Sequence, residues 1–229
     1  MKGTLSVVAT PIGNLEDITH RAVRKLGEVD YILAEDTRVT KKLLNHYHIS
    51  TPTKRYDAHA SESVHERVIA DLLTGKNVAL VSDAGTPGVS DPGVRIVALA
   101  RAEAIEIEAI PGPSAVTAAV SIAGLSGNQF TFLGFVPQKK GRETFFKALA
   151  TYNHPVIFFE STHRIMKTAE ALVKSYGYNS DDQRHVTIAR ELTKLYEEVV
   201  AGTPEEVLQH LSHHPDHQKG EFVVIVSGS

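Results

Sequence analysis

The sequence contains no cysteine, and this absence removes several kinds of chemistry at once. A chain without thiols cannot form disulfides, bind zinc through thiolates or use a cysteine nucleophile. No apolar run approaches the roughly 20 residues that a membrane helix needs, and the apolar stretch after Lys2 is too short for a signal peptide. We therefore expect a protein of the cytoplasm that has no contact with a membrane.

Two nucleotide-binding motifs are also missing. The sequence has no GxxxxGK[ST] phosphate-binding loop and no GxGxxG between a predicted strand and a predicted helix, so ATP hydrolysis and hydride transfer lose their usual support. Basic charge is not in excess either. The formal net charge of −3 is unlike that of proteins that bind nucleic acid through a broad basic face, so any contact with RNA must come from local clusters.

Short apolar runs alternate with amphipathic segments along almost the whole chain, which is 42% hydrophobic and 22% charged, an ordinary globular composition. The runs are rich in β-branched residues and predict strands at 5–10, 30–34, 78–82, 105–110, 130–135, 155–159, 185–189 and 222–226. Helical spacing predicts helices at 18–26, 68–73, 142–150, 165–176 and 204–211. Ser63 with Glu66 predicts a capping box for the second helix, and Thr203 predicts the cap of the last.

Strands that alternate with helices predict an α/β fold of right-handed βαβ units. The Gly- and Pro-dense segment 110–114 is the best domain boundary. We expect an N-terminal α/β domain at 1–112 with a mostly parallel sheet, and a C-terminal α/β domain at 113–229 with a mixed sheet. Ligand sites often lie between domains, which predicts a cofactor cleft between these two.

Three Gly- and Pro-rich loops follow predicted strands of the N-terminal half, at 9–14, 82–93 and 110–115. Open parallel sheets bind ligands at the carboxyl ends of their strands, where glycine lets the backbone approach a small molecule. Asp83 is placed to accept hydrogen bonds from a ligand amine or from ribose hydroxyls. Each loop alone is better explained as a tight turn, with Asp83 as a cap, but three such loops in one half of the chain favour a binding site.

The motif SDAGTPGVSDPG, followed by IPGPSA, resembles the tetrapyrrole methylase superfamily. A longer set of motifs resembles the ribosomal RNA branch of that superfamily: VATPIGNLEDIT, ILAEDTR, FLGFVP, FFESTHRI and ARELTK. The motifs keep one order from Val7 to Val226, nearly the whole chain. The resemblance implies methyl transfer from S-adenosylmethionine to a cytidine ribose 2′-oxygen of small-subunit ribosomal RNA, either free or within an assembled small subunit.

By position, the resemblance implies a set of cofactor-binding residues: Pro11, Gly13, Asp83, Ala84, Gly85, Thr86, Pro87, Ser114 and Ala115, with Gly220 and Glu221 as weaker candidates. The first loop departs from the metabolite-methylating relatives, which carry a GxGPG-type loop where this chain has TPIGN. Side chains and a rigid proline in that loop suit the RNA branch and disfavour a corrin-type substrate. Members of that branch often continue into a small helical tail, so this chain is a short version or lacks that tail.

Transfer to a ribose hydroxyl requires alignment of the acceptor with the methyl group and removal of a proton. Candidate residues for these tasks follow strands in three clusters: Glu35, Asp36 and Arg38; Glu160, His163 and Arg164; Arg190, Glu191 and Lys194. Carboxylates suit a proton acceptor, and arginines suit phosphate because the guanidinium donates two parallel hydrogen bonds. Salt-bridged surface is the alternative explanation for any one cluster, and nothing in the sequence selects the base.

Basic residues in two regions are candidates for contact with RNA, although solvated loops explain them equally well: Arg38, Lys41, Lys42, Lys139, Lys140 and Arg142. Four late histidines have the spacing HxxHHxxH, which matches no known metal site: His210, His213, His214 and His217. We therefore expect a solvated loop there and no metal. The resemblance also implies a homodimer.

Two other functions are compatible with the sequence. A precorrin-type methyltransferase would use the same cofactor on a tetrapyrrole, and the first loop argues against it. A non-catalytic RNA-binding assembly factor would keep the fold without transferring a methyl group, and it would be recognised by its failure to bind S-adenosylmethionine.

Overall fold

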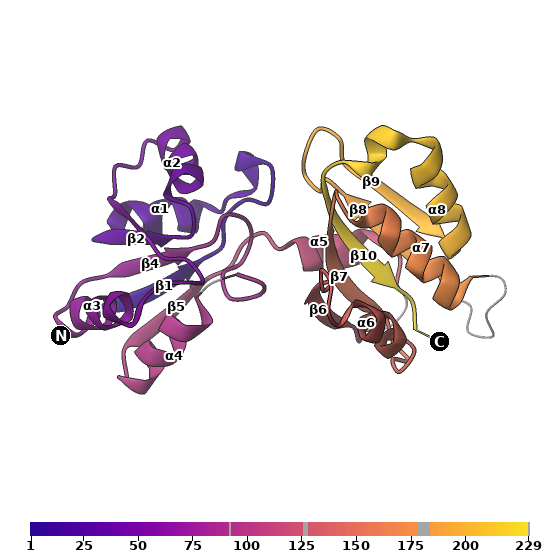
Figure 1. The fold of residues 1–229 in the computed structure, drawn as a ribbon. Coiled ribbons are helices and arrows are strands. Elements are labelled where there is room, and N and C mark those ends of the chain that lie inside the picture. The colour runs from indigo at the N-terminus through magenta and orange to yellow at the C-terminus, as the bar shows by residue number, and fades with distance from the viewer. Residues whose placement is uncertain (92, 126–127, 178–183, 229) are drawn as a thin grey trace. The chain divides into compact units, whose positions relative to one another are not determined.

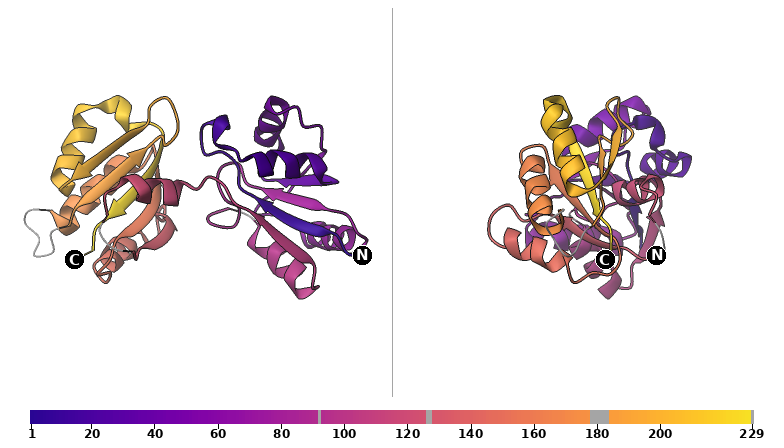
Figure 2. Two further views of the ribbon diagram at one scale, coloured as in Figure 1. Left: turned by 180° about the vertical axis from the view of Figure 1, so that it is seen from behind. Right: turned by 90° about the vertical axis from the view of Figure 1, so that its right-hand side faces the viewer.

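The computed structural model describes residues 1–91, 93–125, 128–177 and 184–228. The chain divides into two units, Met1–Ser114 and Ala115–Ser229, and the division falls directly after the Gly- and Pro-dense segment (Figures 1 and 2). Each unit contains a five-stranded sheet with helices packed on it, which confirms the α/β class. Among the described residues, none of the helices is long and apolar enough to cross a membrane.

The N-terminal domain has a parallel sheet. Its elements are β1 (Thr4–Val8), the short 3-10 helix η1 (Leu15–Asp17), α1 (His20–Glu28), β2 (Tyr31–Ala34), α2 (Thr37–His46), β3 (Thr53–Arg55), α3 (Glu62–Leu73), β4 (Val78–Val81), α4 (Val94–Ala102) and β5 (Glu106–Ile110). The strands lie in the order β3-β2-β4-β1-β5, and every neighbouring pair is parallel. The parallel sheet expected from the alternation of strands and helices is therefore confirmed.

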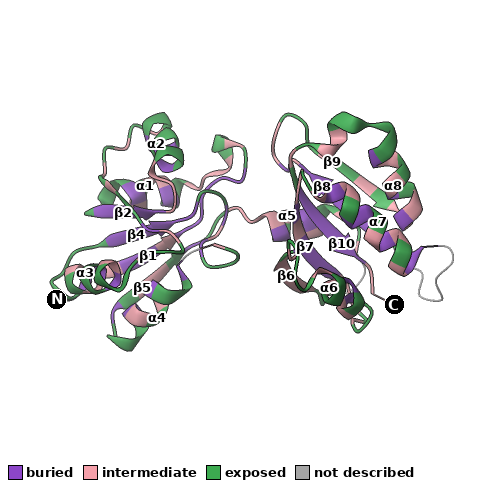
Figure 3. Ribbon diagram, in the orientation of Figure 1, coloured by how far each residue is buried: buried purple, intermediate pink, exposed green. Residues whose placement is uncertain are grey.

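Helices cover both faces of this sheet, because successive residues of a strand point to opposite faces. On β2, Tyr31 and Leu33 belong to the core cluster that α3 and α4 help to form. Ile32 and Ala34, between and after them, belong to the cluster that α1 and α2 help to form. All four residues are buried, which is why the strand reads as a continuous apolar run (Figure 3).

The C-terminal domain has a mixed sheet, as expected. Its elements are α5 (Ala115–Ile122), β6 (Thr131–Phe135), α6 (Arg142–Leu149), β7 (Val156–Ser161), α7 (Ile165–Tyr176), β8 (Val186–Arg190), β9 (Glu198–Gly202), α8 (Pro204–His213), the 3-10 helix η2 (Pro215–Gln218) and β10 (Glu221–Val226). The order is β6-β7-β10-β8-β9. The β6–β7 pair is parallel and the other three pairs are antiparallel.

One core cluster holds this second domain together. Side chains of α6, α7 and α8, among them Phe146, Leu172 and Leu211, pack with Phe158 of β7 and Val224 of β10. All five are at most 5% exposed. Helix α5 contacts β10 as well. The central strands β7, β10 and β8 are therefore fixed by their packing, and this fixes the positions at which the loops at their ends begin.

Helix starts followed the sequence signal in one case and departed from it in another. Thr203 caps α8 as predicted: its hydroxyl accepts from the Glu206 amide, and the Glu206 carboxylate accepts from the Thr203 amide at 2.8 Å. The capping box of Ser63 with Glu66 is wrong, because α3 begins at Glu62 behind Ser61. Burial of His65 on the same face as Val68 extends this helix toward its N-terminus.

Candidate functional site

Parallel pairing brings the carboxyl ends of β1, β2, β4 and β5 to one edge of the N-terminal sheet. The three loops singled out in the sequence begin there: 9–14 follows β1, 82–91 follows β4, and 111–114 follows β5. Strand β1 lies between β4 and β5, so its loop has both of the others as neighbours. Segments that are far apart in the sequence therefore meet at this edge, which we call the N-edge.

Hydrogen bonds join the three loops of the N-edge. Thr10 and Gly85 exchange backbone hydrogen bonds with N···O distances of 2.9 and 3.0 Å. The hydroxyl of Thr86 donates to the carbonyl of Pro113 at 3.1 Å. Gly85 has a φ of 79°, a left-handed conformation that favours glycine. The glycine therefore lets the first two loops pair, and the pairing leaves the adjacent Asp83 exposed.

The residues expected to bind the cofactor differ in exposure. Within the N-terminal domain, Gly13, Asp83 and Ala84 are exposed, Thr86 and Ser114 are half-buried, and Pro11, Gly85 and Pro87 are buried. Ala115 and Glu221 belong to the C-terminal domain. The exposed members offer a carboxylate and backbone groups to a ligand, whereas the buried ones shape the loops that carry them.

Three carboxylates lie near one another at the N-edge. Burial raises the pKa of Glu35, and the nearby charges of Asp83 and Asp91 raise it further. Burial and Asp83 also raise the pKa of Asp91, although the Ser82 hydroxyl lowers it. Within the described part of the chain, no salt bridge neutralises any of the three carboxylates. The N-edge therefore presents negative charge that suits a cationic ligand.

Asp36 and Arg38, the other members of this cluster, bind each other. Asp36 caps α2 by accepting from the Arg38 amide at 2.8 Å, and its side chain pairs with the Arg38 guanidinium at 2.6 Å. The Arg38 side chain holds the pKa of Asp36 well below its usual range, so this carboxylate is a poor proton acceptor. The Asp36 amide in turn donates to Asp83 at 2.9 Å. Arg38 is 87% exposed and remains available to an anionic ligand.

The other two predicted clusters meet at one edge of the C-terminal sheet, which we call the C-edge. Strand β10 runs antiparallel to β7 and β8, and its start pairs with their ends: Glu221 lies opposite Ser161, and Phe222 opposite Arg190. The Thr162 hydroxyl also bonds to the backbone carbonyl and amide of Gly220, at 2.7 and 2.8 Å. Residues 160–164, 190–194 and 220–221 are therefore neighbours.

Glu160 is the centre of a buried ion-pair network. Its side chain is fully buried, and its two oxygens contact Arg164 Nε at 2.9 Å, Arg142 Nη1 at 3.2 Å and the hydroxyl of Thr168 at 2.7 Å. The Ser161 amide donates a fourth hydrogen bond at 2.8 Å. A carboxylate so enclosed can orient its partners but has no free oxygen for a substrate. Arg142, expected to contact RNA, is instead turned inward by this network.

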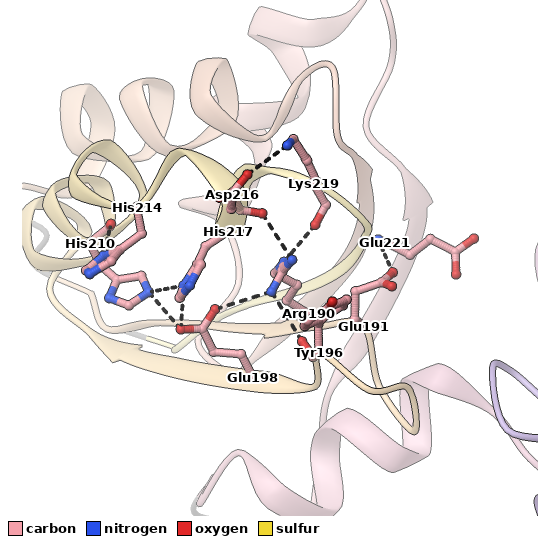
Figure 4. A network of polar contacts seen from close by, with 10 residues as sticks. All are labelled: Arg190, Glu191, Tyr196, Glu198, His210, His214, Asp216, His217, Lys219 and Glu221. Carbon is pink, nitrogen blue, oxygen red and sulfur yellow. Dashed lines mark hydrogen bonds and ion pairs between the residues drawn. The ribbon is translucent and has the colours of Figure 1, made fainter.

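Arg190 holds the backbone of the neighbouring loops. It is 8% exposed and donates to the carbonyls of Lys219 at 2.6 Å, Asp216 at 3.1 Å and Tyr196 at 3.2 Å (Figure 4). Contact with a phosphate would require it to give up these bonds. Arg190 therefore stabilises the loops next to the C-edge and is not free to bind a substrate phosphate.

Lys194 lies between two carboxylates at the surface of the C-edge. Its ammonium is 2.9 Å from Glu191 and 2.8 Å from Glu221. Burial alone would lower the pKa of Lys194, but the hydrogen bonds that its ammonium donates to both carboxylates outweigh burial and raise that pKa. Burial alone would raise the pKa of Glu191. The contacts with Lys194 and with the Glu221 amide outweigh burial, so the pKa of Glu191 is lowered. Both groups therefore stay charged, and Lys194 is a candidate anion ligand rather than a base.

Sequence reasoning missed two groups. Asp91 was part of a recognised motif but was not singled out, although its position in the same loop as Asp83 was an available signal. Glu198 was not noticed at all, and the structure places it beside the late histidines that were set aside as a solvated loop. Residue spacing in the sequence could not reveal that Glu198 contacts these histidines, because Glu198 lies in a strand and the histidines lie at and after the end of a helix.

Comparisons with known proteins bear on this arrangement. The model of the family Tetrapyrrole (Corrin/Porphyrin) Methylases matches residues 4–208. The ribosomal RNA small subunit methyltransferase I of Halalkalibacterium halodurans is 47% identical over 229 residues, which cover 100% of this chain and 77% of that protein. The protein of the same name from Thermotoga maritima is 43% identical over 226 residues, 99% of each chain.

A solved structure shares the fold at lower identity. The crystal structure of diphthine synthase has a TM-score of 0.74 at 17% identity and covers 99% of this chain and 90% of that one. The predicted resemblance, the two-domain α/β fold and the assignment as a methyltransferase are confirmed by these matches taken together. An enzyme of this kind requires a methyl donor. The chain belongs to the tetrapyrrole methylase family, and within that family it is similar to the proteins named ribosomal RNA small subunit methyltransferase I.

Proposed function

We propose that this methyltransferase transfers a methyl group from S-adenosylmethionine to a cytidine ribose 2′-oxygen of small-subunit ribosomal RNA. The choice of acceptor rests on one observation: the similarity to proteins named ribosomal RNA small subunit methyltransferase I extends over the whole chain. The fold by itself does not choose an acceptor, because one fold hosts many substrates. The proposed place of action is the cytoplasm, where such relatives would meet their RNA.

The chemistry of the N-edge fits S-adenosylmethionine. The cofactor carries a sulfonium, an ammonium and ribose hydroxyls. The carboxylates of Asp83, Glu35 and Asp91, which no salt bridge in the described part of the chain neutralises, suit cations and hydroxyl donors. Asp83 is the member we assign to direct contact, because it is exposed beside the permissive backbone of Ala84 and Gly85. When bound, the cofactor supplies an electrophilic methyl group.

Glu35 is the proton acceptor that we propose for the ribose hydroxyl. A general base works best when its pKa approaches the working pH, and the pKa of Glu35 is raised by burial and by three neighbouring carboxylates, Asp83, Asp91 and Asp57. Asp36 is kept ionised by Arg38, and Glu160 has both oxygens occupied, so neither competes well for this role. Arg38 of the N-edge and Lys194 of the C-edge are each proposed to contact an RNA phosphate.

Exposed lysines would supply the remaining RNA affinity. Lys41 and Lys42 are exposed on α2, and Lys139 and Lys140 are exposed in the loop after β6. We also propose a homodimer. Two exposed apolar side chains at the ends of the edge strand β6, Phe130 at 42% and Phe135 at 55% exposed, support it. Light scattering at micromolar concentration tests this, and a monomeric mass would remove the dimer.

The decisive experiment measures methyl transfer from S-adenosylmethionine labelled in its methyl group. Assembled small subunits, free small-subunit RNA and a precorrin-type tetrapyrrole are offered in separate reactions. We expect label in RNA, at a cytidine that resists alkaline cleavage because its 2′-oxygen is blocked. Label in the tetrapyrrole alone would overturn the proposed acceptor. Absence of cofactor binding by calorimetry would point instead to a non-catalytic assembly factor.

The variant Glu35→Gln tests the proposed base in the same assay. It should bind labelled cofactor nearly as well as the wild type, because the proposed direct contact is made by Asp83. It should lose methyl transfer, because an amide cannot take the hydroxyl proton. Glu66→Gln is the matched control, since it makes the same change at an exposed glutamate of α3, and it should keep transfer. Equal rates in the wild type and Glu35→Gln would exclude Glu35 as the base.

A further inference from the structure

Three of the four late histidines lie together, and two of them, His210 and His217, contact a carboxylate from a different element. His210 lies in α8, His214 follows that helix, and His217 lies in η2, while Glu198 comes from the edge strand β9 (Figure 4). Candidate ligand atoms of the three imidazoles all lie within 4.8 Å of one another. The rings of His210 and His214 have centroids 4.7 Å apart, and η2 brings His217 next to both.

The distances in this group are those of a shared centre. Glu198 Oε1 lies 2.9 Å from His210 Nε2 and 2.9 Å from His217 Nδ1, and these two nitrogens are 3.2 Å apart. Nitrogen and oxygen ligands of a tetrahedral zinc ion, each about 2.0–2.1 Å from the metal, lie roughly 3.3 Å from each other. The three atoms therefore form a triangle close in size to one face of such a tetrahedron.

Hydrogen bonds and a metal ion are two alternative ways to hold this triangle together. A carboxylate oxygen accepts two hydrogen bonds, so both ring nitrogens can donate to Glu198 Oε1 at 2.9 Å. A divalent cation at the centre would instead bind all three atoms as ligands, at nearly the separations that the structure already shows. Titration with a metal ion distinguishes the two.

His214 is oriented to supply a fourth ligand. Its Nδ1 bonds to the backbone carbonyl of His210 at 2.9 Å, which leaves Nε2 to bind a metal. Its ring stacks on that of His217 with centroids 4.9 Å apart. A backbone bond to the second ring nitrogen is the usual way in which proteins fix the tautomer and direction of a metal-binding histidine.

The loop that carries His217 is held on both sides. Arg190 binds the carbonyls of Asp216 and Lys219, the residues that flank the 217–218 pair. The Gln218 amide donates to the carbonyl of Leu211 in α8 at 2.9 Å. The geometry of the group therefore follows from a supported backbone. The side chains of His210, His217 and Glu198 are also 22–35% exposed, which leaves an entry path for an ion.

We propose that Glu198, His210, His214 and His217 bind one divalent transition-metal ion, with zinc as the best match. Imidazole nitrogens select Zn²⁺ and similar ions over Mg²⁺ and Ca²⁺, which prefer oxygen ligands. The ion joins β9, α8 and η2 behind the C-edge and so has a structural role. This site does not depend on the proposed RNA substrate, because all four ligands belong to the described C-terminal domain.

The test is titration of the full-length, tag-free protein with Zn²⁺ by calorimetry and with Co²⁺ by visible absorption. We expect one equivalent of each ion to bind, with the intense absorption of four-coordinate Co²⁺ and none of the thiolate bands that a chain without cysteine cannot produce. Mg²⁺ should not compete. Zn²⁺ should also raise the unfolding temperature of the wild type, because it binds only the folded state.

Variants decide whether these residues are the ligands. His217→Ala and Glu198→Gln should each weaken Zn²⁺ binding by at least tenfold, since even the loss of an outer-shell partner costs about 10–100-fold. Glu198→Gln keeps the shape of the side chain, so it remains informative if His217→Ala unfolds. His213→Ala is the matched control and should bind normally, because His213 is exposed and outside the group. Absent or non-saturating binding, or equal affinity in all three variants, would overturn the site.

Discussion

The two edges that carry the predicted functional residues handle charge in opposite ways. At the N-edge, Glu35, Asp83 and Asp91 lie close together, and two of them have a raised pKa. At the C-edge, the central carboxylate Glu160 is bound by two arginines, and Lys194 lies between two glutamates. Negative charge is therefore left open in the first domain and neutralised in the second.

The difference follows from how each sheet is built. Parallel strands end in loops of glycine and proline, whose backbone approaches a ligand but carries few side chains that could pair with a carboxylate. Antiparallel strands bring chain ends together residue by residue, so charged side chains from β7, β8 and β10 meet and bind each other. The N-edge is suited to attract a ligand, and the C-edge is suited to hold its shape.

Removing the centre of the C-edge is the largest change that we predict. Glu160→Ala leaves Arg142 and Arg164 without their buried partner, and breaking such a pair typically costs about 3–5 kcal/mol. In hydrogen exchange, the amides of β7 and β10 should lose protection, whereas those of β1 and β4 should stay protected. Glu170→Ala, an exposed glutamate of α7, is the control. Similar losses in both variants would mean that Glu160 is not the centre of the domain.

At the N-edge the corresponding change should affect the ligand and spare the fold. Asp83→Ala should weaken S-adenosylmethionine binding by about one to two decades, the effect of losing a hydrogen bond to a charged group worth ~1.5–3 kcal/mol. Glu28→Ala removes the same charge from α1 and should bind the cofactor normally. Calorimetry measures both. Unchanged affinity in a folded Asp83→Ala variant would remove Asp83 from the site.

The sequence was informative where the signal is local. Apolar runs predicted the central strands of both sheets, and Gly- and Pro-rich stretches predicted the loops of the N-edge. It was silent on β3 and β9, which are short edge strands with exposed residues, and on α2, α4 and α5. Helix α2 contains Arg38, Lys41 and Lys42, so its charges suggested RNA contacts rather than an amphipathic helix.

Pairing of charges could not be predicted, because it depends on residues that only the fold brings together. Arg142 was assigned to RNA since it follows two lysines, but Glu160 of β7 binds it. Arg190 was assigned to the reaction since it ends a strand, but three backbone carbonyls from later loops hold it. The sequence located the clusters but could not predict which of their side chains are bound to other groups of the protein.

A smaller effect tests whether open charge at the N-edge destabilises the fold. The pKa of Glu35 is raised on folding, so the folded state binds more protons than the unfolded state between the ordinary and the raised value. Stability is therefore lost as pH rises through that window. Glu35→Gln does not titrate and should be more stable than the wild type at neutral pH, with the difference vanishing below the ordinary carboxyl range. Urea unfolding from pH 4 to 8 measures it, and a less stable variant at pH 7 would refute the argument.

The smallest expected effect concerns RNA affinity, which a chain of net charge −3 must concentrate in a few places. With Arg142 bound to Glu160, the loop after β6 offers Lys139 and Lys140 alone. Each phosphate contact makes affinity fall with salt by a slope of ~0.7–0.9, because bound counterions are released. Replacing both lysines by Ala should therefore reduce the slope by about 1.4–1.8 and leave S-adenosylmethionine binding unchanged.

The matched control for this double variant replaces two exposed lysines of α7, Lys167 and Lys174, by Ala. It changes the net charge equally, so a general electrostatic effect would appear in both proteins and a local contact in only one. Filter binding of small subunits at several salt concentrations measures the slopes. Equal slopes in the two double variants would mean that the loop after β6 does not touch RNA. Recognition would then rest on the exposed basic residues of α2: Arg38, Lys41 and Lys42.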